Sequence, residues 1–336
     1  MADTRTNGGS GTGAGSLTGR WLVTGAGGML GRDLVAVLGA GADRRVTAAT
    51  RAALDLTDPA ALRAAVAGHD LVVNAAAWTD VDGAESQEAA ATAVNGTGVE
   101  NLARACAETG ALLLHVSTDY VFAGDADRPY PEDAPTAPIS AYGRGKLLGE
   151  QAVTRLLPRT GYLVRTGWLY GAHGRNFVAT ILRVAADREH LDVVNDQQGQ
   201  PTWSYALAQR LVELGEAARD GRAPAGIYHG TATGRTTWYD LAREVFARTG
   251  LDPDRIRPTS SDRFVRAARR PSYSVLAHDR WAAAGLPPMA HWRQMLTEAL
   301  CPAGQPAHGA PVDRRRPAVD PGLTAPHNAR KSIAHF

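Results

Sequence analysis

The sequence predicts an α/β protein with a doubly wound parallel sheet and a smaller C-terminal domain. Short and almost wholly apolar runs alternate with amphipathic stretches through the first half of the chain. Such runs are typical of parallel strands that helices bury on both faces. In addition, a glycine-rich stretch at 23–35, VTGAGGMLGRDLV, joins the first apolar run to the first amphipathic one.

Each predicted strand is an apolar run bounded by glycine or polar residues. The expected strands are residues 20–24, 46–49, 71–74, 112–116 and 162–165, with a further sheet strand at 227–229. Residues 29–38 place four apolar side chains on one helical face. Asp58 followed by Pro59 is typical of an N-cap and a first helical residue, which predicts a helix over 60–67. The remaining helices are expected at 84–109, 140–157, 176–189, 203–219, 237–249 and 291–300.

The composition excludes several classes of function. The net charge is +2, which makes nucleic acid a poor partner. The two cysteines form no CxxC pair, so neither a disulfide framework nor a structural zinc site is expected. No apolar run is long enough for a membrane helix, and the N-terminus lacks the apolar core of a signal peptide. These features together predict a cytoplasmic protein that has no contact with membranes.

The glycine-rich stretch follows a strand and opens a helix, which is the setting of a dinucleotide-binding turn. Gly25 would permit the tight turn, Gly28 would let a pyrophosphate approach the backbone, and Gly31 would let helix and strand pack closely. The positive end of the helix, at Met29 and Leu30, would then attract the phosphates. The spacing is GxxGxxG rather than GxGxxG. The motif predicts a Rossmann-type sheet.

The end of the second strand indicates which cofactor is preferred. An acidic residue there would bind the ribose hydroxyls of NAD, but the strand ends at Thr50 and Arg51. Arg51 could meet a 2′-phosphate, which favours NADPH and leaves NADH open. Asp55, followed by Leu56, could bond the adenine amino group, whereas Asp58 is expected to cap its helix.

The candidate catalytic residues stand at the end of the fourth predicted strand and on the helix predicted over 140–157. Thr118 stands where the fourth strand ends, and ligands of such sheets bind beyond the carboxyl ends of the strands. Tyr142 and Lys146 form a YxxxK pair, and residues four apart share one helical face. An ammonium near the phenol would lower the pKa of Tyr142 and make it a better acid or base. Thr118 could bond a substrate carbonyl.

In this order, the motifs resemble the extended short-chain dehydrogenase/reductase superfamily and, within it, the dTDP-4-dehydrorhamnose reductase family. The matching segments run in family order from about residue 21 to 300. They are NAAAWTDVDGAE at 74–85, Val94-Asn95, STDYVF at 117–122, RTGWLYG at 165–171, Asn176-Phe177, DQQGQPT at 196–202, and Arg270-Pro271 with Ser274 and Leu276. The departures are Gly167 where serine is usual, Trp78 where tyrosine is usual, and an unmatched tail after about 301.

This resemblance implies an NAD(P)H-dependent reductase of nucleotide-sugar biosynthesis. The reaction would convert the C4 ketone of dTDP-4-dehydro-L-rhamnose to the alcohol of dTDP-L-rhamnose. Tyr142 would donate the proton, with Thr118 as a second donor, and Lys146 would hold the nicotinamide ribose. The expected cofactor-binding residues are Gly25, Gly28, Met29, Leu30, Gly31, Arg51, Asp55, Leu56, Ala75, Ala76, Ala77, Tyr142 and Lys146.

For the substrate, the resemblance implies that Thr118, Asp119 and Trp168 line the sugar site. Asn176 and Arg270 would meet the nucleotide part, where a planar guanidinium suits a diphosphate. The plain structural alternatives are a core aromatic for Trp168, a helix N-cap for Asn176 and a solvated side chain for Arg270.

Two other functions fit the same motifs. One is a related dTDP-4-keto-6-deoxyhexose reductase of antibiotic biosynthesis, such as a ring-contracting dTDP-dihydrostreptose synthase. The other is a non-catalytic regulatory subunit of methionine adenosyltransferase, against which the complete Thr118, Tyr142 and Lys146 set argues. Some members of the family hold Mg²⁺ at a dimer contact. Since no local acidic motif is present, we predict no metal site and leave a homodimer open.

The domain boundaries follow from these assignments. We predict a disordered extension at 1–18, a dinucleotide-binding domain at 19–170 that about 196–235 completes, and a mainly substrate-binding domain at 171–301. The polar and proline-rich residues 302–336 are predicted to be a disordered tail.

Overall fold

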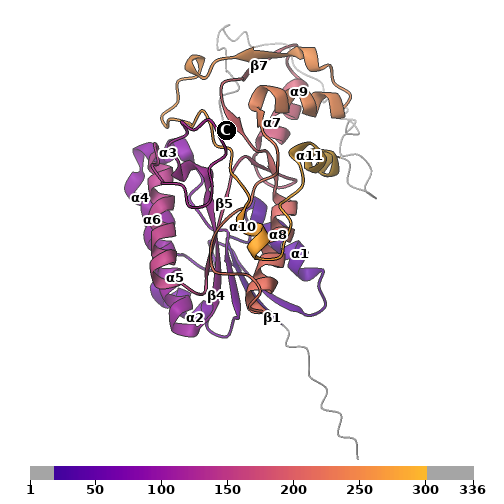
Figure 1. Cartoon of the computed structure of the whole chain (residues 1–336). Helices are drawn as coiled ribbons and strands as arrows, with labels where there is room; N and C mark the ends of the chain where they lie inside the picture. The colour runs from indigo at the N-terminus through magenta and orange to yellow at the C-terminus, as the bar shows by residue number, and fades with distance from the viewer. Residues whose placement is uncertain (1–18, 301–336) are drawn as a thin grey trace, which may run out of the picture.

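The computed structural model describes residues 19–300, and its centre is a six-stranded parallel sheet (Figure 1). The strand order is β10-β5-β4-β3-β1-β2. The strands are β1 (Gly19–Thr24), β2 (Arg44–Ala49), β3 (Leu71–Asn74), β4 (Leu112–Thr118), β5 (Gly161–Thr166) and β10 (Gly226–His229). The fold class predicted from the sequence is confirmed, and the late strand at 227–229 does join the sheet beside β5.

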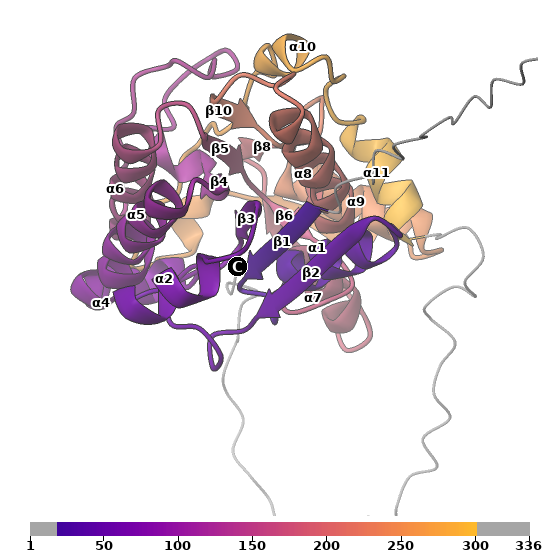
Figure 2. The same ribbon diagram turned by 90° about the horizontal axis from the view of Figure 1, so that it is seen from below.

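Helices cover both faces of this sheet (Figure 2). On one face lie α1 (Met29–Gly39) and α8 (Ser204–Arg219), and on the other lie α2 (Pro59–Val66), α5 (Gly98–Thr109) and α6 (Ala141–Leu156). The protein has one hydrophobic core on each face of the sheet, and successive side chains of β1 point alternately into the two cores. Trp21 and Val23 pack with α1 and α8, whereas Leu22 packs with α2 and α5, and all three are fully buried.

A smaller lobe sits above the carboxyl ends of the strands (Figure 1). It contains α7 (Phe177–Ala185), α9 (Trp238–Arg248) and the parallel pair β7 (Leu191–Val194) and β12 (Ile256–Thr259). The short elements that join the two parts are β6 (Leu169–Tyr170), β8 (Gln198–Gly199), β9 (Thr202–Trp203), β11 (Thr236–Thr237), α10 (Arg280–Ala283) and α11 (Trp292–Leu300).

The predicted single helix over 84–109 is wrong in one respect, because the structure divides it. It consists of α3 (Val81–Ser86), α4 (Glu88–Thr92), a π-helical turn η1 (Ala93–Thr97) and α5. Gln87 leaves helical geometry between α3 and α4. In the π turn, Asn95 accepts from the backbone N–H of Trp78 at 2.8 Å and donates to its carbonyl at 3.0 Å. These two bonds fix the loop after β3.

The other predicted helices match the structure to within a few residues. Asp58 caps α2 as expected, since its carboxylate accepts from the N–H groups of Ala60 and Ala61. The segments predicted to be disordered, 1–18 and 302–336, lie outside the described residues. Among residues 19–300, no helix has the length and apolar character needed to cross a bilayer.

The sheet order decides where a ligand can bind. β1 has β2 on one side and β3 on the other. The connection from β1 to β2 and the connection from β2 to β3 therefore run in opposite directions across the sheet. The crossing connections separate at this point and leave a crevice beyond the carboxyl ends of the strands. The glycine-rich turn after β1 and the loop after β3 both border that crevice.

Candidate active site

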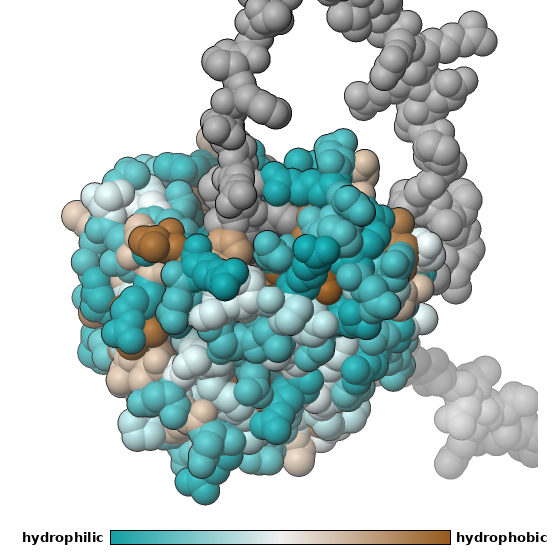
Figure 3. Space-filling view, turned by 90° about the horizontal axis from the view of Figure 1, so that it is seen from above, coloured by the Kyte–Doolittle hydropathy of each residue, from teal (hydrophilic) through white to brown (hydrophobic). Residues whose placement is uncertain are grey.

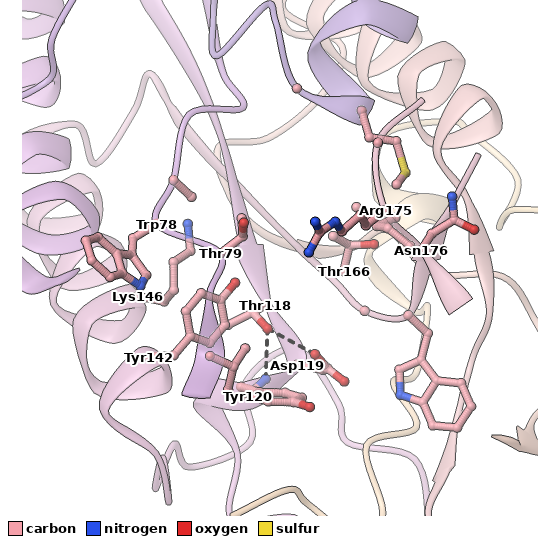
Figure 4. A pocket seen from close by; sticks show the side chains of 18 of the residues that line it. Trp78, Thr79, Thr118, Asp119, Tyr120, Tyr142, Lys146, Thr166, Arg175 and Asn176 are labelled. Atoms are coloured by element: carbon pink, nitrogen blue, oxygen red, sulfur yellow. Dashed lines mark hydrogen bonds between the residues drawn. The ribbon is translucent and has the colours of Figure 1, made fainter. Parts of the chain in front are cut away.

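A cavity of about 1390 Å³ lies between the sheet and the smaller lobe. Every cofactor- and substrate-binding candidate named from the sequence lines it. Figure 3 views the molecule from this side, where the described surface around the cavity is mostly hydrophilic. In Figure 4, Tyr142, Lys146 and Thr118 lie on one side of the cavity, and Arg175 and Asn176 lie on the other.

The turn between β1 and α1 has the geometry that the glycines were expected to serve. Gly25 has φ +69°, and a Cβ there would lie 2.5 Å from the backbone nitrogen of Ala76. A Cβ at Gly31 would lie 2.8 Å from the Cα of Ala26 and would meet the carbonyl of Gly25. Within residues 19–300 no side chain caps α1, and the start of this helix, Gly28 to Leu30, lines the cavity.

The second strand places Arg51 at the exposed edge of the cavity. Asp55 and Leu56 line the same edge. One carboxylate oxygen of Asp55 accepts from the backbone and hydroxyl of Thr57, both at 2.8 Å, and these bonds lower the pKa of Asp55. The carboxylate therefore has a fixed direction at the place where an adenine is expected.

The YxxxK pair projects from one face of α6 into the cavity (Figure 4). The expected effect of Lys146 on the phenol is wrong for this state of the protein. Burial raises the pKa of Tyr142 to about 12, with the Thr118 hydroxyl opposing and the Asp119 charge adding to the rise. The amine of Lys146 is directed to the backbone instead, since it donates to the carbonyl of Val116 at 2.7 Å.

Lys146 is itself deeply buried, with 2% of its surface exposed. Burial lowers its pKa to about 8, and the charge of Glu150 opposes that shift. The second neighbour of its amine is Nε2 of His115, at 3.2 Å. Sequence reasoning assigned His115 no functional role, because a single histidine in a strand is not a motif.

Thr118 and Asp119 form the floor of the cavity at the end of β4. The Thr118 hydroxyl accepts from the backbone N–H of Tyr120 and donates to Asp119 at 3.0 Å. Burial raises the pKa of Asp119 to about 6. A Cβ at Gly167 would lie 2.7 Å from the Asp119 carboxyl carbon, so the glycine that departs from the family pattern lies directly against this acid.

Trp168 is held in an unusual conformation at the cavity wall. Its φ is +51°, which is left-handed and rare for a bulky residue. Its ring stacks on Trp238 with centroids 3.4 Å apart and planes 3° apart, and it lies flat over Gly199. Sequence reasoning missed Trp238, which lies on α9 and is brought here only by the smaller lobe.

The two candidates for the nucleotide part of a substrate already have protein partners. Asn176 caps α7, because its side-chain oxygen accepts from the N–H of Ala179, and its amide also donates to the carbonyl of Gly171. The helix N-cap expected as the alternative role of Asn176 is therefore confirmed, and the residue also lines the cavity. Arg270 is not a solvated surface residue. Its guanidinium contacts both carboxylate oxygens of Asp82 on α3, and Arg266 pairs with the same acid.

Several further cationic and aromatic groups line the cavity without having been predicted. They include Arg175, Arg266, Arg269 and Trp78. The run RFVRAARR at 263–270 was the available signal, since it holds four arginines in eight residues, and three of them, Arg266, Arg269 and Arg270, line the cavity. In the part of the chain that the structure describes, no group of three or more His, Cys, Asp or Glu side chains could hold a metal ion.

Comparison with known proteins identifies relatives of the whole described region. A family model described as the RmlD substrate binding domain matches residues 19–303. A dTDP-4-dehydrorhamnose reductase of Streptomyces griseus is 58% identical over 243 residues, which are 71% of this chain and 80% of that protein. A dTDP-4-keto-6-deoxy-D-glucose reductase of Streptomyces niveus is 53% identical, over 68% of this chain and 78% of the relative.

A solved structure with the same architecture contains a cofactor. It is the dTDP-4-dehydrorhamnose reductase of Bacillus anthracis in complex with NADP. It is 34% identical, with a TM-score of 0.78, and the match covers 84% of this chain and 98% of that one.

Proposed function

The chain belongs to the dTDP-4-dehydrorhamnose reductase family, and on that premise we propose that it reduces the C4 ketone of dTDP-4-dehydro-L-rhamnose with NADPH to give dTDP-L-rhamnose. One observation carries the proposal. A single cavity brings the glycine turn at the N-terminus of α1 together with Thr118, Tyr142 and Lys146. The glycine turn, in which Gly25 and Gly31 leave no room for a Cβ, fits the pyrophosphate of a dinucleotide.

NADPH supplies the hydride when bound, and the chain's own residues deal with the charge that develops on the ketone oxygen. Because burial raises its pKa to about 12, Tyr142 remains a phenol at neutral pH and can give up its proton to that oxygen. Thr118 lies at the end of β4, and its hydroxyl is a second possible donor to the ketone oxygen. Lys146, one turn further along α6, is placed to hold a ribose hydroxyl.

For the substrate, we propose that Asp119 and Trp168 bound the sugar site and that Arg270 and Asn176 face the nucleotide. A diphosphate would then compete with Asp82 for the Arg270 guanidinium, since both are anions with paired oxygens. The lobe at 171–301 would form most of this subsite, and the sheet at 19–170 with 196–235 would form the cofactor subsite. A homodimer and a cytoplasmic location are also part of this proposal.

A second candidate is reduction of a related keto sugar in antibiotic biosynthesis. The relative from Streptomyces niveus supports it, because its name gives dTDP-4-keto-6-deoxy-D-glucose as substrate. A ring-contracting reduction, as in a dTDP-dihydrostreptose synthase, would use the same cofactor site and the same tyrosine. The regulatory subunit of methionine adenosyltransferase gains no support from the relatives described above.

The test is NADPH consumption with dTDP-4-dehydro-L-rhamnose generated in place from dTDP-glucose, followed by NMR of the product. A six-membered dTDP-L-rhamnose supports the proposal, and a ring-contracted product supports the second candidate. Tyr142→Phe is expected to lower turnover roughly 10²–10⁴-fold while NADPH still binds. Tyr162→Phe is the matched control, because that hydroxyl bonds Ala223 outside the cavity. Turnover near wild type in Tyr142→Phe would exclude this tyrosine as the acid.

A further inference from the structure

Lys146 is chemically unlike every other cation of the described chain. The sequence has 36 lysines and arginines, and the only lysines are Lys146 and Lys331. Among the lysines and arginines of residues 19–300, Lys146 is therefore the one that can lose its proton near neutral pH, because arginine stays charged. It is also buried, with its amine between a carbonyl and a histidine.

A chain of buried hydrogen bonds leads to that histidine and has a fixed direction. The backbone N–H of Ala76 donates to Oδ1 of Asn74 at 3.1 Å, and the Thr24 hydroxyl donates to the same oxygen at 2.6 Å. A backbone N–H can only donate, so this end of the Asn74 amide must be the oxygen. The NH₂ end then faces Nδ1 of His115 at 2.9 Å.

The direction of this bond determines the tautomer of His115. The amide nitrogen can only donate, so Nδ1 must accept, and the hydrogen of a neutral imidazole then sits on Nε2. The ring is neutral because burial holds the pKa of His115 well below its usual value. Nε2–H therefore points at the Lys146 amine, 3.2 Å away.

An ammonium has three donors and no acceptor, whereas a neutral amine has a lone pair. We propose that the relay from Ala76 through Asn74 and His115 presents a donor to Lys146 and so disfavours its ammonium form. Asn74 and His115 are positioning residues in this proposal, since they act on the site through Lys146.

The other groups that face Lys146 do not supply a compensating negative charge. Glu150, one turn along α6, favours the ammonium, but its two oxygens are taken by the guanidinium of Arg165 at 2.9 and 2.8 Å. Tyr142, one turn earlier, is a neutral phenol. The third neighbour is the carbonyl of Val116. The lowered pKa of Lys146, about 8, agrees with this balance.

The catalytic consequence rests on the proposed function. Because the relay disfavours the ammonium form of Lys146, the positive charge beside Tyr142 is not constant and declines as the pH rises through about 8. The protonation state itself can be measured without substrate, so it is tested separately from the reductase activity.

The experiment is a pH titration of the full chain labelled with ¹³C at lysine Cε. Only two signals are present, and Lys331→Arg identifies the one from Lys146. We expect Lys146 to titrate near 8, roughly two units below a free lysine. Nitrogen-15 NMR of the histidines, with His115 assigned by substitution, should show hydrogen on Nε2.

Asn74→Asp is an isosteric variant that should reverse the direction of the hydrogen bond between residue 74 and Nδ1 of His115. It keeps an oxygen toward Ala76 and Thr24 and places a second acceptor against Nδ1 of His115. The expected result is hydrogen on Nδ1 and a Lys146 midpoint at least about one unit higher. His229→Phe is the control, because it removes another buried imidazole, which bonds Ala277 and not the relay. That variant should leave the Lys146 midpoint unchanged.

Three results would overturn the inference. The first is a wild-type Lys146 that titrates like a free lysine, and the second is a wild-type His115 with hydrogen on Nδ1. The third is a higher midpoint in Asn74→Asp without a change of tautomer, which would assign the shift to the added charge alone. If Asn74→Asp does not fold, the two wild-type measurements still decide the question.

Discussion

Gly31→Ala is a direct test of the packing that forms the cofactor turn. The added Cβ would meet the carbonyl of Gly25 and lie 2.8 Å from the Cα of Ala26, and neither backbone atom can rotate away. Overpacking typically costs ~1–3 kcal/mol, while alanine in a helix gains ~1 kcal/mol over glycine. We expect a net loss of up to roughly 2 kcal/mol in the free energy of unfolding and NADPH affinity at least about tenfold weaker.

Gly39→Ala is the matched control on the same helix. No atom lies within 4 Å of a Cβ at that position, so the helical gain remains and stability should rise by roughly 0.5 kcal/mol. Urea unfolding and fluorescence titration with NADPH measure both quantities. If Gly31→Ala unfolds and binds NADPH like the wild type, the tight contact does not limit the turn, and the reasoning fails.

Three further changes have defined outcomes. Arg51→Asp should shift the ratio of activities toward NADH, and an unchanged ratio would remove Arg51 from the 2′-phosphate site. The second change is at Asp82. Burial tends to raise the pKa of this carboxyl group, but hydrogen bonds from Arg270 and Ala268 hold it at about 2. This stabilisation is present above the unfolded pKa of about 4 and is lost as pH falls toward 2. Asp82→Asn should therefore cost roughly 1 kcal/mol at pH 7, after discount for solvent screening, and the difference in urea unfolding should disappear near pH 2. Glu150→Gln should destabilise the fold by about 3–5 kcal/mol, because it leaves the buried Arg165 charge without its partner; a loss under about 1 kcal/mol in the same assay would contradict this.

The sequence predicted the parts of the site that depend on local pattern. The turn at 25–31 was recognised because glycines at that spacing between a strand and a helix have few other uses. The Tyr142–Lys146 pair was found because residues four apart on a helix share a face. The helix 84–109 was predicted as continuous because alanine-rich segments favour helix, and no local signal marks the π turn that Asn95 needs to reach Trp78.

The sequence by itself determined the order of strands and helices, the position of the glycine turn and a part of the cavity lining that includes Thr118, Tyr142 and Lys146. Only the tertiary structure decided how these groups behave. The pKa of Tyr142 depends on its burial, and the charge of Lys146 depends on His115, 31 positions away in the chain. The pairing of Arg270 with Asp82 joins residues 188 positions apart. The periodicity of apolar residues along the chain indicates on which face of a helix or strand a side chain lies. Protonation and ion pairing depend on desolvation and on neighbours that only the folded chain brings together.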